Sequence, residues 1–117
     1  MNKALKQDYK QKKFSTGVFQ IRNTLNNKIF IDSSTNLDAI WNRHKFELNM
    51  GGHRNEELQK DWTAAGEENF TFEILSEIKQ DDTVNTDYAR EAKQLAVIFI
   101  QELQPFGEKG YNKQAAK

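Results

Sequence analysis

The segment GVFQIRNTLNNKIFIDSST, residues 17–35, restricts the fold of the chain more than any other part of the sequence. β-Branched and aromatic residues, which favour strands, occupy both of its halves. The polar residues between the halves include Asn26 and Asn27, and asparagine tolerates the positive φ of a short turn. The segment therefore predicts an antiparallel β-hairpin.

The rest of the chain predicts one more strand and three helices. The spacing of apolar residues predicts a helix over 36–50, a helix over 55–65, a strand over 69–78 and a long helix ending near residue 103. Asn36 is expected to cap the first helix, and Gly51 and Gly52 to end it. The order ββααβα predicts an α+β domain, in which the hairpin and a third strand form a small three-stranded sheet covered by helices.

Length and composition exclude several classes of protein. A chain of 117 residues suits one domain, and the absence of cysteine excludes disulfides and thiolate metal sites. No apolar run approaches the roughly 20 residues of a membrane span. We therefore expect a cytoplasmic protein with no membrane contact, divided into a basic N-terminal arm (1–14), one domain (15–112) and a polar tail (113–117).

Charge is unevenly distributed, although the chain is neutral overall. Residues 1–60 contain eleven Lys and Arg and six Asp and Glu, whereas residues 61–117 contain six and eleven, so the halves carry about +5 and −5. A basic half can orient a polyanion, and an acidic half can meet a protein partner. Two ordinary solvated surfaces explain the same pattern equally well.

Short motifs in a fixed order resemble the GIY-YIG endonuclease family from Gly17 to Asn112. The matching motifs are Gly17-Val18-Phe19, Phe30-Ile31-Asp32, Ser33-Ser34-Thr35-Asn36-Leu37, Asn42-Arg43-His44, Gly52-His53-Arg54-Asn55, Leu58-Gln59-Lys60-Asp61-Trp62, Phe70-Thr71-Phe72-Glu73-Ile74-Leu75, Pro105-Phe106-Gly107 and Gly110-Tyr111-Asn112. The resemblance implies the small sheet and helices described above, and an ancestry in phosphodiester hydrolysis.

The resemblance also implies which positions carry the chemistry. Family members use hairpin tyrosines to activate water, an arginine on the first helix to hold the phosphate, and a glutamate on the last helix to bind a divalent metal. The matching positions here are Phe19, Phe30, Ile40 and Ala96. Each replacement lacks the proton-transfer group, positive charge or ligand oxygen that hydrolysis requires. We therefore expect an inactive family member, a pseudoenzyme with no metal site.

Other positions keep residues with functional groups. His53 and Asn112 match positions that assist the family site, and His44 matches a helix histidine found there. Arg43, one turn beyond Ile40, is a possible replacement phosphate ligand. Each residue also has a structural interpretation: His44 as a hydrogen-bonded core histidine, His53 as a helix cap and Asn112 as a partner for backbone groups.

Three functional hypotheses follow. The first is a non-cleaving domain that binds nucleic acid, DNA rather than RNA, through a basic surface formed by Lys10, Lys12, Lys13, Arg43, Lys45, Arg54 and Lys60. The second is an active endonuclease with a rebuilt site formed by Arg43, His44 and His53, which would use Mg or Mn. The third is a protein-interaction module that uses the acidic C-terminal half.

Overall fold

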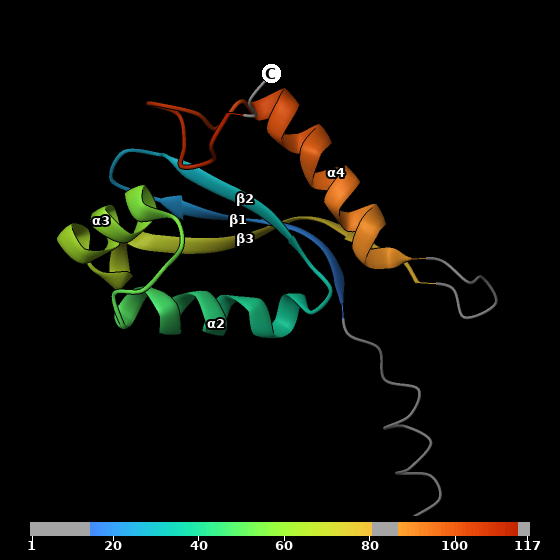
Figure 1. Ribbon diagram of the computed structural model, residues 1–117, viewed down its shortest axis with the longest axis horizontal. Coiled ribbons are helices and arrows are strands. Elements are labelled where there is room, and N and C mark those ends of the chain that lie inside the picture. The colour runs from blue at the N-terminus through green and yellow to red at the C-terminus, as the bar shows by residue number, and fades with distance from the viewer. Residues whose placement is uncertain (1–14, 81–86, 115–117) are drawn as a thin grey trace, which may run out of the picture.

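A three-stranded sheet with helices on both faces forms the centre of the computed structural model, which describes residues 15–80 and 87–114 (Figure 1). Its elements are β1 (Thr16–Asn23), β2 (Ile29–Ser34), α2 (Leu37–Asn49), α3 (Glu56–Ala65), the short 3₁₀ helix η1 (Glu67–Asn69), β3 (Phe70–Ile78) and α4 (Tyr88–Leu103). The predicted α+β class and the order ββααβα are confirmed. Lys10, Lys12 and Lys13 of the expected basic arm lie outside the described residues.

The hairpin predicted from the sequence forms two thirds of the sheet. β1 lies in the middle and pairs antiparallel with both β2 and β3, so that the strand order is β2-β1-β3. Asn27 has a φ of 63° in the turn, and the Asn23 and Lys28 backbone groups close it with a 2.9 Å hydrogen bond. Asparagine adopts this left-handed conformation at little cost, which explains its place in the turn.

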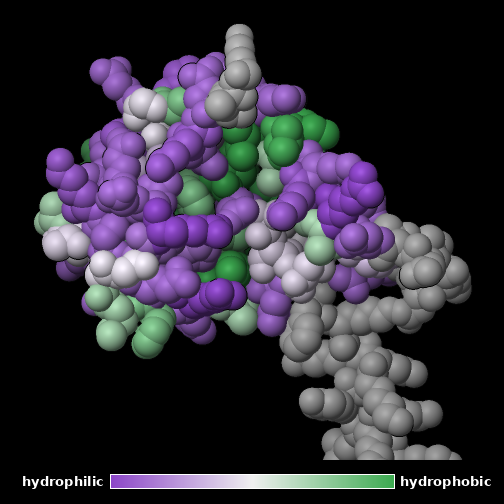
Figure 2. Space-filling view, viewed as in Figure 1, coloured by the Kyte–Doolittle hydropathy of each residue, from purple (hydrophilic) through white to green (hydrophobic). Residues whose placement is uncertain are grey.

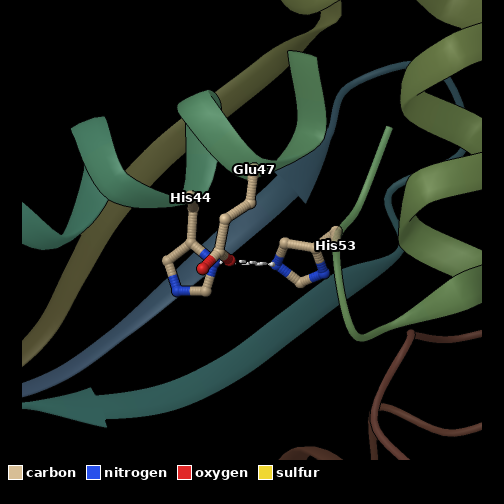
Figure 3. A group of neighbouring side chains, drawn as sticks. All are labelled: His44, Glu47 and His53. Carbon is tan, nitrogen blue, oxygen red and sulfur yellow. Dashed lines mark hydrogen bonds and ion pairs between the residues drawn. The ribbon is translucent and has the colours of Figure 1, made fainter. Parts of the chain in front are cut away.

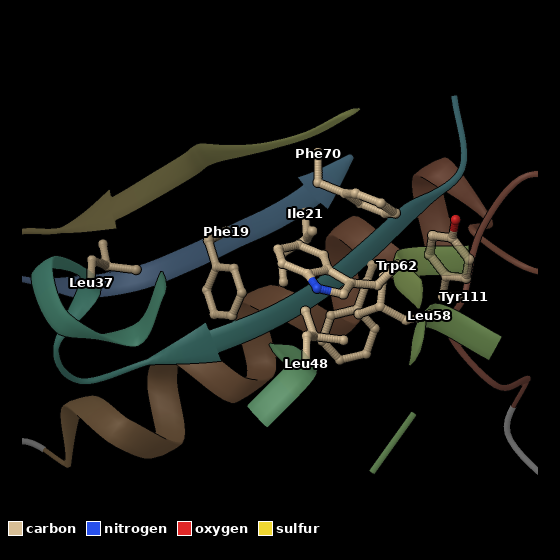
Figure 4. Close-up of a cluster of buried hydrophobic side chains, with 9 residues drawn as sticks. Phe19, Ile21, Leu37, Leu48, Leu58, Trp62, Phe70 and Tyr111 are labelled. Atoms are coloured by element: carbon tan, nitrogen blue, oxygen red, sulfur yellow. The ribbon is translucent and has the colours of Figure 1, made fainter. Parts of the chain in front are cut away.

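Alternate side chains of β1 enter two separate cores. Phe19 and Ile21 are fully buried against α2 and α3, where they join Leu58 and Trp62 (Figure 4). Val18 points to the opposite face of the sheet, in a cluster with residues of α4. Successive side chains of a strand alternate between faces, so this central strand holds helices on both sides of the sheet.

The start of α2 differs from the expectation for Asn36. Asn36 occupies the N-cap position, but within the described part of the chain its side chain makes no capping hydrogen bond and its Oδ1 is buried without a partner. The amide of Leu37 instead donates to the carbonyl of Ser15, at 2.8 Å. A backbone carbonyl just before β1 thus satisfies the first amide of α2, while the expected side-chain cap at Asn36 does not form among the described residues.

The segment after α4 returns to the hairpin and fixes the edge of β2. Gly110 forms an isolated parallel bridge with Ile29, and the Tyr111 amide donates to the Ile29 carbonyl at 2.8 Å. Asn112 bonds both backbone groups of Ile31: its Oδ1 accepts from the amide at 2.8 Å, and its Nδ2 donates to the carbonyl at 2.9 Å. These bonds give partners to backbone groups on the edge of β2 that does not pair with β1.

Polar residues cover most of the face shown in Figure 2, and apolar residues lie between them, most densely beside α4. Among the residues that the structure describes, no helix has the length and apolar character needed to cross a membrane.

Candidate functional site

A pocket of about 300 Å³ lies between the outer side of β2, the face of α2 and the loop that follows α2. It is lined by Asp32, Ser33, Ile40, Arg43, His44, Glu47, Gly52 and Arg54. A second, more open pocket of about 370 Å³ shares Asp32 and Arg54 with it and continues to Ile100 and Asn112. The Asp32–Arg54 ion pair, with a 2.8 Å contact between the carboxylate and the guanidinium, therefore separates two adjoining pockets.

Two histidines from different parts of the chain meet beside this pocket, and one of them, His44, lines it. His44 and Glu47 extend from α2, and His53 reaches them from the loop that leads to α3 (Figure 3). Nδ1 of His44 lies 2.8 Å from Nε2 of His53. Both residues are buried, with 4% and 6% of their surface exposed.

The backbone of the loop fixes where these rings carry their protons. The Asn55 amide donates to Nδ1 of His53 at 3.0 Å. A ring nitrogen that accepts an N–H holds no proton, so the single proton of neutral His53 lies on Nε2. That proton points to Nδ1 of His44, which accepts it, and the proton of neutral His44 therefore lies on its own Nε2.

Both rings are neutral near pH 7. Burial, together with the neighbouring His53, Arg54 and Arg43, lowers the pKa of His44 to about 4. Burial also lowers the pKa of His53, although the nearby Glu47 carboxylate partly opposes this effect. A charged imidazolium in this position would lose its hydration and meet two guanidinium groups.

The phenyl rings of Phe19 and Phe30 pack against the two histidines. The ring centroid of Phe19 lies 5.5 Å from that of His44, and the Phe30 centroid lies 5.9 Å from His44 and 6.0 Å from His53. Ile40 lines the pocket and packs against the core that contains Phe19. The structure thus brings three of the four positions that the resemblance assigns to catalysis close to the histidines.

Ala96, the fourth position, lies elsewhere. It is 5% exposed and packs with Val18 and Ile31 on the α4 face of the sheet, whereas Phe19 points to the α2 face. A metal ion implied by the resemblance would find no ligand atom there. Ala96 therefore does not fit the metal site of the family.

A different group of side chains comes closer to a metal-binding arrangement. One ligand atom each of His44, Glu47 and His53 lies within 4.8 Å of the others. A metal needs the lone pair of its histidine ligands, but Nε2 of His53 carries the proton because Asn55 occupies Nδ1. This group does not fit a resident metal either, since binding would first have to break the Asn55 hydrogen bond.

Only some residues of the predicted basic surface line the pocket. Arg43 and Arg54 both line it, with side chains 76% and 73% exposed. Lys45 lies over the Trp41 ring, 5.3 Å from its centroid, and does not line this pocket. Lys60 is an exposed residue of α3.

Glu47, which was not predicted from the sequence, lies beside both Arg43 and His53. Its Oε2 lies 3.6 Å from Nε of Arg43, and its Oε1 lies 4.0 Å from Nε2 of His53. The spacing of His44 and Glu47, three residues apart on one helix, was the available signal. Asn112 was found by sequence, but both polar atoms of its side chain are engaged with Ile31, which favours its structural interpretation.

Comparisons with known proteins identify relatives of the chain by sequence and by fold. No protein-family model matches the chain. Intron-associated endonuclease 1 of Enterobacteria phage T4 is 38% identical over 63 residues, which make up 54% of this chain. The match spans only a quarter (25%) of that relative.

Solved structures extend the match over most of the chain. The catalytic domain of the homing endonuclease I-TevI superposes with a TM-score of 0.70 and 30% identity, covering 86% of this chain and 99% of that one. A glutamate-to-alanine variant of the same domain gives a TM-score of 0.71 and 31% identity, covering 89% and 98%. Because it matches nearly all of a solved catalytic domain in both fold and sequence, this chain belongs to the GIY-YIG endonuclease family.

Proposed function

We propose that this domain binds nucleic acid at the pocket over His44 and His53 and does not cleave it efficiently. The observation that carries this proposal is the composition of the pocket. Two exposed guanidinium groups, those of Arg43 and Arg54, line it beside the carboxylates of Asp32 and Glu47. The aromatic rings that pack behind its His44 are the phenyl groups of Phe19 and Phe30.

The two parts of the proposal have separate physical reasons. Arginine side chains bind phosphate oxygens without reading sequence, which supports binding. A phenyl ring can neither donate nor accept a proton, and Ala96 supplies no ligand oxygen, so the groups that would activate water are missing. Relatives described as endonucleases make a nucleic acid the natural ligand. We expect DNA to be preferred to RNA.

A binding experiment tests the first part. Fluorescence anisotropy with labelled duplex DNA, single-stranded DNA and duplex RNA would be measured at several salt concentrations. Affinity should fall steeply with salt, because neutralised phosphates release counterions. The double variant Arg43→Ala/Arg54→Ala should bind all sequences more weakly, with a salt slope on duplex DNA shallower by about 2. The matched control is Arg90→Ala/Lys93→Ala, which removes two exposed charges from α4, away from the pocket.

A plasmid-nicking assay with Mg²⁺ or Mn²⁺ tests the second part. A rebuilt site of Arg43, His44 and His53 is the second candidate function, and the 2.8 Å contact between the two histidines favours it. Metal-dependent nicking that disappears in His53→Ala would establish this candidate. A protein that neither binds nor nicks at low salt would contradict both candidates and favour a protein partner for the acidic half of the chain.

A further inference from the structure

The solvent side of α2 carries an exposed aromatic side chain outside the pocket. Phe46 is 66% exposed, and among the residues that the structure describes it is the one exposed aromatic residue. Met50, four residues further along the chain, is 72% exposed. Residues four apart on a helix are neighbours, so the two side chains form one apolar patch. Single exposed apolar residues are common on protein surfaces, whereas an adjacent pair that includes an aromatic ring indicates a contact surface.

Positively charged side chains lie on both flanks of this patch. Arg43 precedes Phe46 by three residues, and its exposed guanidinium group lines the pocket. On the other flank, the ammonium group of Lys45 lies 5.3 Å from the centroid of the Trp41 ring. The carboxylate of Glu47, the next residue after Phe46, is engaged with Arg43 at 3.6 Å. The two cations favour an anionic ligand over the patch.

The chain beyond Met50 leaves room for such a ligand. Met50 is the C-cap of α2, and Gly51 and Gly52 follow it. Within the described part of the chain, a Cβ at either glycine would have nothing within 4 Å. Gly52 also lines the pocket. A strand that extends out of the pocket can therefore pass over Phe46 and Met50 without meeting other side chains at the glycines.

A nucleobase is the part of such a strand that matches an exposed phenyl ring. Base and ring stack face to face, and the contact tolerates every base because each base has a π-face. The flexible, polarizable thioether of Met50 can adapt to the edge of the same base. In an intact duplex the neighbouring base pairs cover these faces, so the base that stacks on Phe46 must be unpaired.

We propose that Phe46, extended by Met50, is a stacking platform for an unpaired base of a bound nucleic-acid strand. The inference rests on the proposed function, because the binding of the strand delivers the base to α2. Single-stranded or locally unpaired DNA is then the form of ligand that uses this surface. Phe46 contributes affinity and reads no particular base.

Fluorescence anisotropy with two labelled single strands tests the proposal on the full chain. One strand is an oligothymidine, and the other has the same length and backbone but abasic sites in place of its bases. Phe46→Leu keeps an apolar side chain but removes the π-face. It should weaken oligothymidine binding about five-fold or more, the loss expected for one base–aromatic contact, and leave the affinity for the abasic strand unchanged. Phe46→Tyr, which keeps the ring, should retain most of the affinity.

A matched control removes a comparably exposed apolar side chain from another part of the surface. Leu25, in the hairpin turn, is 67% exposed, and Leu25→Ala should leave both affinities unchanged. A fully paired duplex provides the second control, because its bases are already stacked, and Phe46→Leu should bind it as well as the wild type does. Circular dichroism would show that each variant is folded.

NMR of the aromatic protons gives a second reading on the unmodified protein. The ring signals of Phe46, assigned by their absence from the spectrum of Phe46→Leu, should move upfield when oligothymidine is added, because a stacked base shields the protons of the ring beneath it. The abasic strand should not produce this shift.

The outcomes separate this inference from the proposed function. Oligothymidine binding that is equal in the wild type and in Phe46→Leu would overturn the platform and leave the proposed function intact. Equal losses for the oligothymidine and the abasic strand would overturn the base contact, and an equal loss for the duplex would overturn the need for an unpaired base. Self-association that depends on Phe46, without a base-dependent effect, would assign this surface to a second copy of the chain instead. A protein that binds no oligonucleotide would overturn both proposals.

Discussion

Acidification should destabilise this domain through His44. The pKa of this residue is lowered to about 4 in the folded protein, mainly by burial, whereas the unfolded chain has the ordinary value near 6.5. When the pH falls below about 6.5, His44 of the unfolded chain binds a proton, whereas His44 of the folded protein stays neutral until about pH 4. Acid therefore favours the unfolded chain, and the stability present near pH 7 is lost as the pH falls from about 6.5 towards about 4.

The size of the effect follows from the two pKa values. With about 4 in the folded state and 6.5 in the unfolded state, His44 alone removes about 2 kcal/mol of unfolding free energy at about pH 5 and about 3 kcal/mol at about pH 4. The lowered pKa of His53 adds to the loss with the same sign. A domain of this size has a stability of only about 5–15 kcal/mol, so the loss should be easy to measure.

Urea unfolding measures this effect, with the fluorescence of buried Trp62 as the signal. Carboxylates also titrate in this range, and the variant His44→Gln provides the comparison that removes their contribution. Glutamine does not titrate, and its Oε1 can still accept the proton of His53 Nε2. The unfolding free energy of the wild type should fall between pH 7 and pH 5 by about 2 kcal/mol more than that of the variant. Equal losses in the two proteins would refute a buried, neutral His44.

Two further predictions concern the fold that holds the site. Tyr111→Phe removes the hydroxyl that accepts a 3.0 Å hydrogen bond from Nδ2 of buried Asn23. The unfolding free energy measured in urea should fall by about 1–2 kcal/mol, because the Asn23 amide loses its partner. An unchanged urea midpoint would contradict this prediction. Gly17→Ala places a Cβ against the Ser76 carbonyl and should lower the melting temperature, while Gly52→Ala, with nothing within 4 Å, should leave it nearly unchanged. Equal melting temperatures would show that β1 and β3 can move apart freely.

Local sequence patterns determined the elements and their order. Alternating apolar residues and an asparagine turn specify the hairpin, since a strand with one buried face needs a period of two and the turn needs a residue that tolerates positive φ. Asn55 begins α3 as a local signal should, with its side chain accepting from the Leu58 amide at 2.9 Å. Asn36 occupies the predicted N-cap position of α2, but among the described residues its side chain makes no capping hydrogen bond, and the Leu37 amide donates to the Ser15 carbonyl from a distant part of the chain.

The proton positions and pKa values of the functional groups depend on the tertiary structure. The sequence identified His44, His53, Arg43 and Arg54 separately, but hydrogen-bond direction depends on how the loop before α3 folds. Only there does the amide of Asn55 meet His53 and assign a proton to each ring. Burial then sets the pKa of His44, and packing sends Ala96 to the other face of the sheet. Proton positions and pKa values depend on neighbours brought together from distant parts of the chain, which is why periodicity and spacing alone could not supply them.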